Sequence, residues 1–185
     1  MAFSNSDYYE YIIKKVRLMI KFHEIDNLNP GKCEHCADSR SLALQIAKLV
    51  SDNMAYSNNN TYSSQDMELL SRNKTAESML ELIERSYIVY LTNENDELVG
   101  CGMVVRQDGR YFAKTLHIRN DCRGLGYAQQ ICDLREDFIR NMGEREIYIE
   151  SLKYPKTIEF HKKRGFAETP PYRELKYTVL MKKQI

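Results

Sequence analysis

The stretch Arg123-Gly124-Leu125-Gly126-Tyr127-Ala128 lies between a strand-like run, 111–118, and a helix-like run, 127–142. A glycine-rich turn that opens a helix leaves backbone N–H groups unpaired, and the helix dipole adds partial positive charge there. Gly124 and Gly126 also let a ligand come close to the backbone. The hexapeptide therefore predicts an anion site suited to phosphate, with an ordinary strand-to-helix connection as the alternative.

Two common phosphate motifs do not fit this turn. No Gly-Lys-Ser or Gly-Lys-Thr follows it, which excludes a Walker loop, and its spacing does not match a dinucleotide fingerprint. Arg123 can add a charged contact to a bound anion. The hexapeptide alone does not identify the bound anion, so the motifs in the rest of the chain are needed.

The composition is that of a single globular domain with room for a short N-terminal segment. Of 185 residues, 43% are hydrophobic and 29% charged, and the net charge of +1 gives no reason to expect nucleic acid. From residue 151 onward, nine Lys and Arg stand against three Glu. This excess is either a solvated basic face or an attraction for a phosphorylated ligand.

The chain shows no signal for a membrane or for secretion. No segment approaches the roughly 18 apolar residues that span a bilayer, and the N-terminus lacks the apolar core of a signal peptide. Five cysteines, an odd number, suit reduced thiols better than a disulfide framework. We therefore expect a cytoplasmic protein without a membrane partner.

Apolar spacing predicts helices first and strands later. The first 25 residues favour a helix, or a helix that ends in a strand through Phe22, and 27–32 form a turn. A helix capped by Ser39 or Ser41 follows, then a polar loop, 56–64, and two further helices that begin near Ser63 and Thr75. The later elements are strands 87–91, 98–105 and 111–118, helix 127–142, strand 146–150, helix 157–164 and a last strand over 175–181.

This order of elements resembles the GNAT superfamily of acyl-CoA-dependent N-acetyltransferases. The hexapeptide matches the family's pyrophosphate motif, Gln/Arg-x-x-Gly-x-Gly/Ala, and Leu116-His117-Ile118 matches the Leu-x-Val strand end before it. The run 158–166 resembles the family's Phe-Tyr-x-x-x-Gly-Phe segment. The resemblance covers about 39–183, so we expect an N-terminal extension, 1–38, packed on an acyltransferase domain, 39–185.

The resemblance implies an α/β (α+β) fold with a mixed, mostly antiparallel central sheet and helices on both faces. Two strands would splay apart, and acetyl-CoA, the expected cosubstrate, would lie between them like a short extra strand. The turn amides would bind its pyrophosphate. The positions implied for CoA binding are Leu116, His117, Ile118, Arg123, Gly124, Leu125, Gly126, Tyr127, Ala128, Tyr154 and His161.

The catalytic residues are less well marked than the CoA site. His161 stands where the family commonly has a Tyr that protonates the leaving thiolate, and Tyr154 where it often has Asn. His161 is either a substitute acid or a surface residue, and Tyr154 is a second acid candidate. Glu150 is a candidate base, with capping of the next helix as its structural alternative. His117 is a second candidate base, with packing in the strand as its alternative. Solvent could also take the proton from the amine.

Cys33-Glu34-His35-Cys36, with His23 nearby, contains zinc-type ligands. No second CxxC follows, and the spacing from His23 fits no zinc pattern. Incidental loop thiols are therefore the favoured interpretation, with metal and redox roles as alternatives, and we predict no metal.

The leading hypothesis is transfer of an acetyl or other small acyl group from acyl-CoA to an amine by direct attack. The alternatives are a CoA-binding sensor or inactive relative, and an interaction module that uses the tyrosine-rich N-terminus. The acceptor would be an amine-bearing small molecule, peptide or protein, and a homodimer is a further expectation. Its pocket would lie near 55–72 and 169–176, where Tyr56, Tyr62 and Tyr172 stand.

Overall fold

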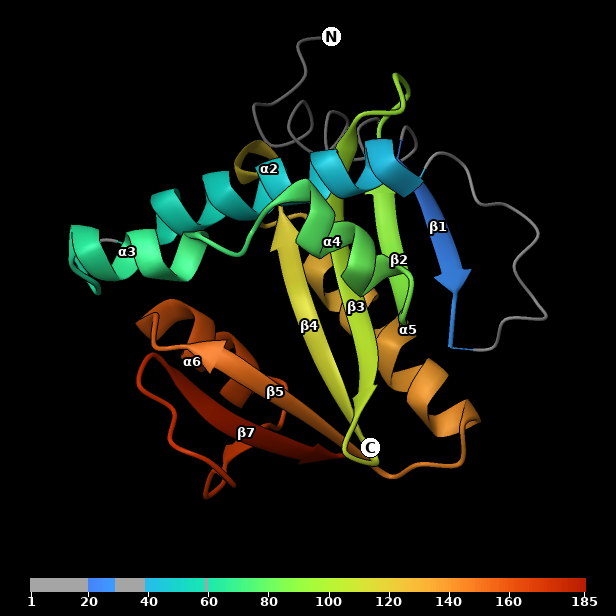
Figure 1. Ribbon diagram of the computed structural model, residues 1–185. Helices are drawn as coiled ribbons and strands as arrows, with labels where there is room; N and C mark the ends of the chain where they lie inside the picture. Colours follow the sequence, from blue (N-terminus) through green and yellow to red (C-terminus); the bar gives the residue numbers. More distant parts are fainter. Residues whose placement is uncertain (1–19, 29–38, 59) are drawn as a thin grey trace, which may run out of the picture.

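The computed structural model describes residues 20–28, 39–58 and 60–185. These residues form five α-helices and one seven-stranded sheet of order β1-β2-β3-β4-β5-β7-β6, antiparallel except between β4 and β5 (Figure 1). The elements are β1 (Lys21–Asp26), α2 (Ser39–Ser57), α3 (Ser64–Ser71), α4 (Ala76–Ile83), β2 (Ser86–Thr92), β3 (Leu98–Gln107), β4 (Arg110–Ile118), α5 (Tyr127–Asn141), β5 (Glu146–Leu152), α6 (Pro155–Lys163), β6 (Ala167–Glu168) and β7 (Thr178–Gln184). The predicted mixed, mostly antiparallel fold is confirmed.

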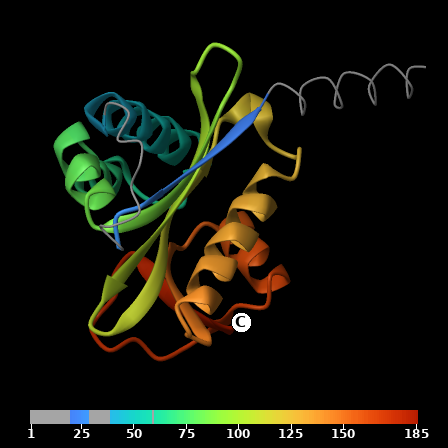
Figure 2. The same ribbon diagram turned by 90° about the vertical axis from the view of Figure 1, so that its right-hand side faces the viewer.

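The helices cover both faces of the sheet. Figure 2 shows α5 on one face, with α2 and α4 on the other. Helix α2 buries the apolar stripe that its sequence predicted, which includes Ile46 and Val50. Side-chain caps fix the starts of the two short helices: the Ser63 hydroxyl accepts from the Asp66 amide, and Thr75 and Ser78 form a capping box.

A glycine in β3 brings α5 close to the sheet. A Cβ on Gly102 would lie 2.4 Å from the Ile131 Cγ2 and 3.3 Å from the Cδ of Arg135, both on α5. Because carbon atoms cannot approach so closely, any side chain at Gly102 would push the helix away. The position of the N-terminus of α5 depends on this contact.

Strands β4 and β5 meet at one end and separate toward the other. They form a single parallel pair, Phe112 with Tyr148, whereas β5 pairs with β7 along its whole length. Figure 1 shows the two strands diverging toward their carboxyl ends. The splayed pair predicted from the family resemblance is therefore present.

A β-bulge interrupts β4 within the splayed part. The register against β3 shifts between Cys101 and Met103, and Thr115 has a left-handed φ of 55°. Arg135 braces the bulge from α5, because its Nη1 donates to the Met103 oxygen at 3.5 Å and to the Lys114 oxygen at 3.3 Å. Because of the extra residue, Leu116 packs on the α5 side, as Ala113 does before the bulge.

The N-terminal segment contributes an edge strand. Residues 21–26 pair antiparallel with β2, in line with the strand expected through Phe22. The described residues do not include the helix predicted for the first part of the chain, most of the turn at 27–32, or the pair Cys33 and Cys36. The boundary at residue 38 stays a prediction.

The last strand begins later than its alternating pattern predicted. Strand β7 starts at Thr178, so Leu175 and Tyr177 belong to the connection from β6. Tyr177 is held there by side-chain contacts, since its hydroxyl donates to the Asp66 carboxylate at 2.8 Å.

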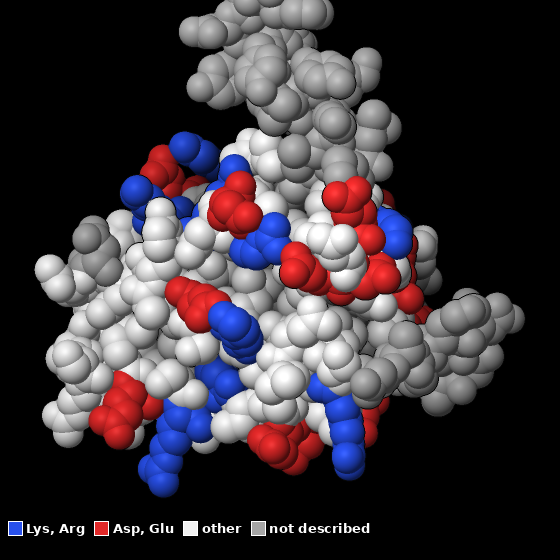
Figure 3. All heavy atoms as spheres, turned by 90° about the horizontal axis from the view of Figure 1, so that it is seen from above, with Lys and Arg blue, Asp and Glu red and all other residues white. Residues whose placement is uncertain are grey.

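The described surface carries charges of both signs. On the face seen from above, Lys and Arg side chains are interspersed with Asp and Glu (Figure 3). Within the described ranges, no helix is both long and apolar enough to cross a bilayer.

Candidate functional site

The glycine turn has the backbone shape that its sequence predicted. Gly124 and Gly126 have left-handed φ values of 79° and 84°, and Gly126 is the N-cap of α5. Residues other than glycine rarely adopt these angles. Neither glycine's amide donates to an acceptor within the described part of the chain. The turn thus presents backbone N–H groups at the positive end of a 15-residue helix.

Arg123 braces the turn from the side of α2. Its Nη2 donates to the Asn53 Oδ1 at 2.9 Å, and its guanidinium lies 4.8 Å from the centre of the Tyr56 ring. The buried Asn53 also donates to the Ile118 oxygen at 2.9 Å. The structure therefore gives Arg123 protein partners, where the sequence predicted a contact to the anion.

The main-chain edge of β4 is open beside this turn. Beyond Phe112, none of the β4 residues pairs with β5, while the other edge stays paired with β3 up to Ile118. Leu116 and Ile118 pack with the core on the α5 side. An extended ligand could therefore hydrogen-bond along this edge and end at the turn.

His117 lies on the α2 side of the splayed pair. Burial, with the nearby charges of Lys74 and Arg123, lowers the pKa of its imidazole to about 4. The Asn53 amide nitrogen lies 3.5 Å from its Nδ1, consistent with a neutral ring that accepts there. His117 is therefore neutral at pH 7 and a weak base.

His161 lies on α6 and is only 8% exposed, so it is not the surface residue considered as the alternative to a catalytic acid. Its ring packs edge-on against Phe160 and Phe166. Burial, with the charges of Arg135 and Arg164, lowers its pKa to about 4. At neutral pH the ring can donate an N–H hydrogen bond, but it carries no extra proton.

Tyr154 faces the helices on the other side. Its hydroxyl lies 3.5 Å from the Met54 oxygen and 3.6 Å from the Met67 sulfur, and its ring meets Tyr62 edge-on at 5.4 Å. Burial raises the pKa of Tyr154 to about 12. These contacts join the start of α6 to α2 and α3.

Glu150 points to the α4 side of β5, and both of its oxygens have partners. Oε1 accepts from the Tyr172 hydroxyl at 2.8 Å, and Oε2 accepts from Arg173 at 2.7 Å. Glu150 is thus tied to the connection between β6 and β7.

The structure thus divides the sequence-predicted site residues between two sides. The open edge of β4 and the glycine turn come together, with His161 on the α5 side. Glu150 and His117 lie on the side of α2 and α4, and Tyr154 is tied to α2 and α3. No local pattern indicated the roles of Asn53, Arg135 or the Thr115 bulge, since each acts through contacts with distant segments.

Metal ligands are not grouped in the described ranges, where no three His, Cys, Asp or Glu side chains could share an ion. His23 stacks on Tyr90 at 4.6 Å and contacts the Thr92 hydroxyl. Cys33, His35 and Cys36 lie outside the described residues. Cys101, Cys122 and Cys132 are buried free thiols.

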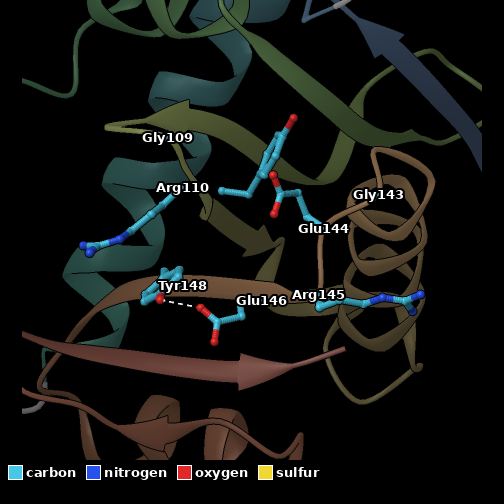
Figure 4. Close-up of a pocket in the computed structure, with 8 residues that line it drawn as sticks. Gly109, Arg110, Gly143, Glu144, Arg145, Glu146 and Tyr148 are labelled. Carbon is cyan, nitrogen blue, oxygen red and sulfur yellow. Dashed lines mark hydrogen bonds between the residues drawn. The ribbon is translucent and has the colours of Figure 1, made fainter.

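A cavity of about 290 Å³ lies at the closed end of the splayed pair, far along β4 from the glycine turn (Figure 4). Charged groups of both signs line it, including Arg110, Glu144 and Glu146, and the Tyr148 hydroxyl donates to Glu146. It contains none of the predicted site residues. The open edge of β4 is the stronger candidate site.

The splayed strands, the bulge and the glycine turn before α5 define a GNAT-type fold. The chain belongs to the acetyltransferase (GNAT) family, whose sequence model matches residues 52–166. Family membership supports acyl-CoA binding and acyltransferase function in general. No curated protein sequence matches the chain significantly.

Solved structures share this fold at low sequence identity. The PaiA N-acetyltransferase of Thermoplasma acidophilum, in complex with coenzyme A, has a TM-score of 0.70 at 11% identity, covering 90% of this chain and 99% of its own. A GNAT-family acetyltransferase of Staphylococcus aureus Mu50 has a TM-score of 0.63 at 15% identity, covering 89% and 98%. An acetyltransferase of Streptococcus agalactiae has a TM-score of 0.60 at 13% identity, covering 90% and 98%.

Proposed function

We propose that the protein transfers an acetyl or other small acyl group from acyl-CoA to an amine. The observation that carries this proposal is the open main-chain edge of β4 leading directly to the glycine turn. The pantetheine arm would bind along Leu116 and Ile118, and the pyrophosphate would bind backbone amides of the turn, foremost those of Gly124 and Gly126. The thioester would then lie between the splayed strands.

The chemistry would be a direct attack. The neutral amine adds to the thioester carbonyl, and main-chain N–H groups of β4 stabilise the oxyanion that forms. The C–S bond then breaks, CoA leaves as the thiolate, and the nitrogen loses its proton. No covalent intermediate on the protein is needed.

The two buried histidines suggest how protons are handled. Because the pKa of both His117 and His161 is lowered to about 4, neither serves as a charged acid at neutral pH. We propose that His161 donates a hydrogen bond to the departing sulfur, whose thiol pKa near 8.5 makes it a fair leaving group. Solvent takes the amine proton, Glu150 remains a second candidate base, and Tyr154 anchors α6.

Calorimetry with acetyl-CoA and a thiol-release assay with a panel of primary amines test this proposal. We expect micromolar acetyl-CoA binding and release of free CoA that depends on the amine. Absence of acetyl-CoA binding at high micromolar concentration would overturn the proposal.

A CoA-binding sensor is the second candidate function. It is favoured by the same two neutral histidines and by the occupied oxygens of Glu150. Tight acetyl-CoA binding without thiol release across small amines, peptides and proteins would support the sensor over the enzyme.

A further inference from the structure

The side of the splayed strands that faces α4 carries more positive than negative charge. At its centre is Lys114 of β4, a half-buried residue that lies next to the bulge at Thr115. Its ammonium group lies 3.3 Å from the Gln107 side-chain oxygen and 5.8 Å from the centre of the Phe112 ring. Neither neighbour neutralises its charge.

The surroundings of Lys114 add further positive charge. Three cations, Lys74, Arg85 and Arg173, interact with it, against one carboxylate, Glu150. Within the described residues, no carboxylate lies within 4.0 Å of the charged groups of Lys74, Arg85 or Lys114, whereas Glu150 is already paired with Arg173 at 2.7 Å. Burial, together with these cations, lowers the pKa of Lys114.

Lys114 is also close to the expected reaction centre. Strand β4 turns Phe112 and Lys114 toward α4, while Leu116 and Ile118, beyond the bulge, face α5. If CoA lies on the open edge of β4 at Leu116 and Ile118, then the ammonium of Lys114 is two residues away along the strand. It lies on the α4 side of β4, opposite to Leu116 and Ile118.

A partly buried cation without a direct ion pair is costly unless a ligand supplies the missing charge. A polyamine or a lysine-rich segment would add more positive charge and be repelled. An acceptor with a negative group beside its amine would neutralise Lys114 while its nitrogen reaches the thioester.

We propose that the acceptor is an amine that also carries a carboxylate, in the manner of an amino acid, and that Lys114 binds this carboxylate. This inference rests on the proposed acyl transfer. Lys74 and Arg85 supply the surrounding positive field, and Glu150, with Arg173, borders the site on β5.

The test compares matched acceptors that differ only in the carboxylate. A panel of amino acids and their carboxamides is assayed for thiol release with acetyl-CoA. We expect a carboxylate acceptor to have a kcat/KM roughly tenfold or more above that of its amide, the size of a charge-assisted hydrogen bond. Lys114→Met should remove this preference and Lys114→Arg should keep most of it, with acetyl-CoA affinity unchanged in both.

The control variant is Lys182→Met. Lys182 lies on β7 and is paired with Glu146 at 3.1 Å, so its loss should leave the acceptor preference unchanged. Equal rates for acids and amides, a preference for polyamines, or a Lys114→Met variant that weakens both acceptors equally would each overturn the inference.

A binding measurement separates failure of this inference from failure of the proposed function. Calorimetry on the CoA-bound protein compares N-acetylated amino acids with their carboxamides, which requires no turnover. Preferential binding of an acid, lost in Lys114→Met, supports the carboxylate site even if no acceptor reacts. Equal affinities, or no binding by any member, overturn it, whereas failure of acetyl-CoA itself to bind overturns the proposed function.

Discussion

At the residue scale, Gly126 combines two requirements in one position. Its φ of 84° belongs to the left-handed region, and it is the N-cap of α5, where a phosphate would approach the backbone. A side chain would strain the turn and occupy the space beside its amides.

We predict that Gly126→Val abolishes measurable acetyl-CoA binding in calorimetry. Gly109→Val is a matched control, because Gly109 has a similar φ of 74° but lies in the turn between β3 and β4. The control should lose stability and keep acetyl-CoA affinity. Equal losses of affinity in both variants would mean that backbone strain alone explains the effect.

His161 gives the second prediction at this scale, which concerns pH. Its pKa is about 4 in the folded protein and about 6.5 in the unfolded chain, so the unfolded state binds more protons between these values. Stability should therefore fall as the pH drops from about 6.5 to 4, with His161 contributing about 3 kcal/mol. His161→Phe should lack this part of the loss of stability at low pH.

Urea unfolding of both proteins at pH 7 and pH 4.5 measures the difference. Because the His161 ring is neutral near pH 6.5, the pH profile of kcat/KM should have no inflection there that is due to this residue. The profiles of the unaltered protein and of His161→Phe should therefore have the same shape near pH 6.5, without an inflection that only the variant lacks. Such an inflection would show that His161 is charged in the free enzyme and restore it as a proton donor.

At the element scale, helix α2 and the glycine turn act as one unit through Asn53. This buried side chain contacts Arg123 and the Ile118 oxygen, both at 2.9 Å, and so joins α2 to the end of β4 and the start of the turn. Periodicity predicted α2 correctly, but a polar residue on its buried face carried no sign of its partners.

We predict that Asn53→Ala lowers the free energy of unfolding by about 1–3 kcal/mol, because it leaves buried polar groups without partners. It should also weaken acetyl-CoA binding, since Arg123 loses its anchor. Denaturant titration and calorimetry measure the two effects.

Asp52→Ala provides the control on the same helix. Asp52 pairs with Lys48 at 2.7 Å on the exposed surface, and such pairs contribute about 0–1 kcal/mol. A variant of Asn53 that behaves like the Asp52 control would show that the link to the turn is unimportant.

At the scale of the whole molecule, acyl-CoA would bridge parts of the chain that are distant in sequence. The open edge of β4, the turn and α6 come together only through the sheet and the docking of α5 at Gly102. A ligand that binds all of them should stabilise the fold as a unit.

We predict that acetyl-CoA at about 100 times its Kd stabilises the protein by about 2.7 kcal/mol and raises Tm by roughly 5–10 °C. Thermal unfolding followed by circular dichroism measures the shift. Adenosine at the same concentration should give little effect, and Gly126→Val should respond to neither. An unchanged Tm with acetyl-CoA would contradict binding to the folded state.

Most of the helices and strands, their order and the glycine turn could be predicted from the sequence alone, although β6 was missed and β7 begins later than expected. These depend on local physics: apolar periodicity, helix caps such as Ser63 and Thr75, and backbone angles that favour glycine. The same local motifs, read in order, were enough to indicate the family, and the match over residues 52–166 confirmed it.

The chemistry available at the site depends on tertiary contacts. Burial among other segments holds His117 and His161 neutral and directs the Tyr154 hydroxyl toward α2 and α3. It also leaves Lys114 without a direct ion pair in the described part of the chain. Charge and proton affinity depend on desolvation and on neighbours that lie far away in the sequence. A local sequence pattern contains no information about those neighbours. The pyrophosphate turn could therefore be predicted from the sequence, whereas the protonation and contacts of the candidate catalytic residues could not.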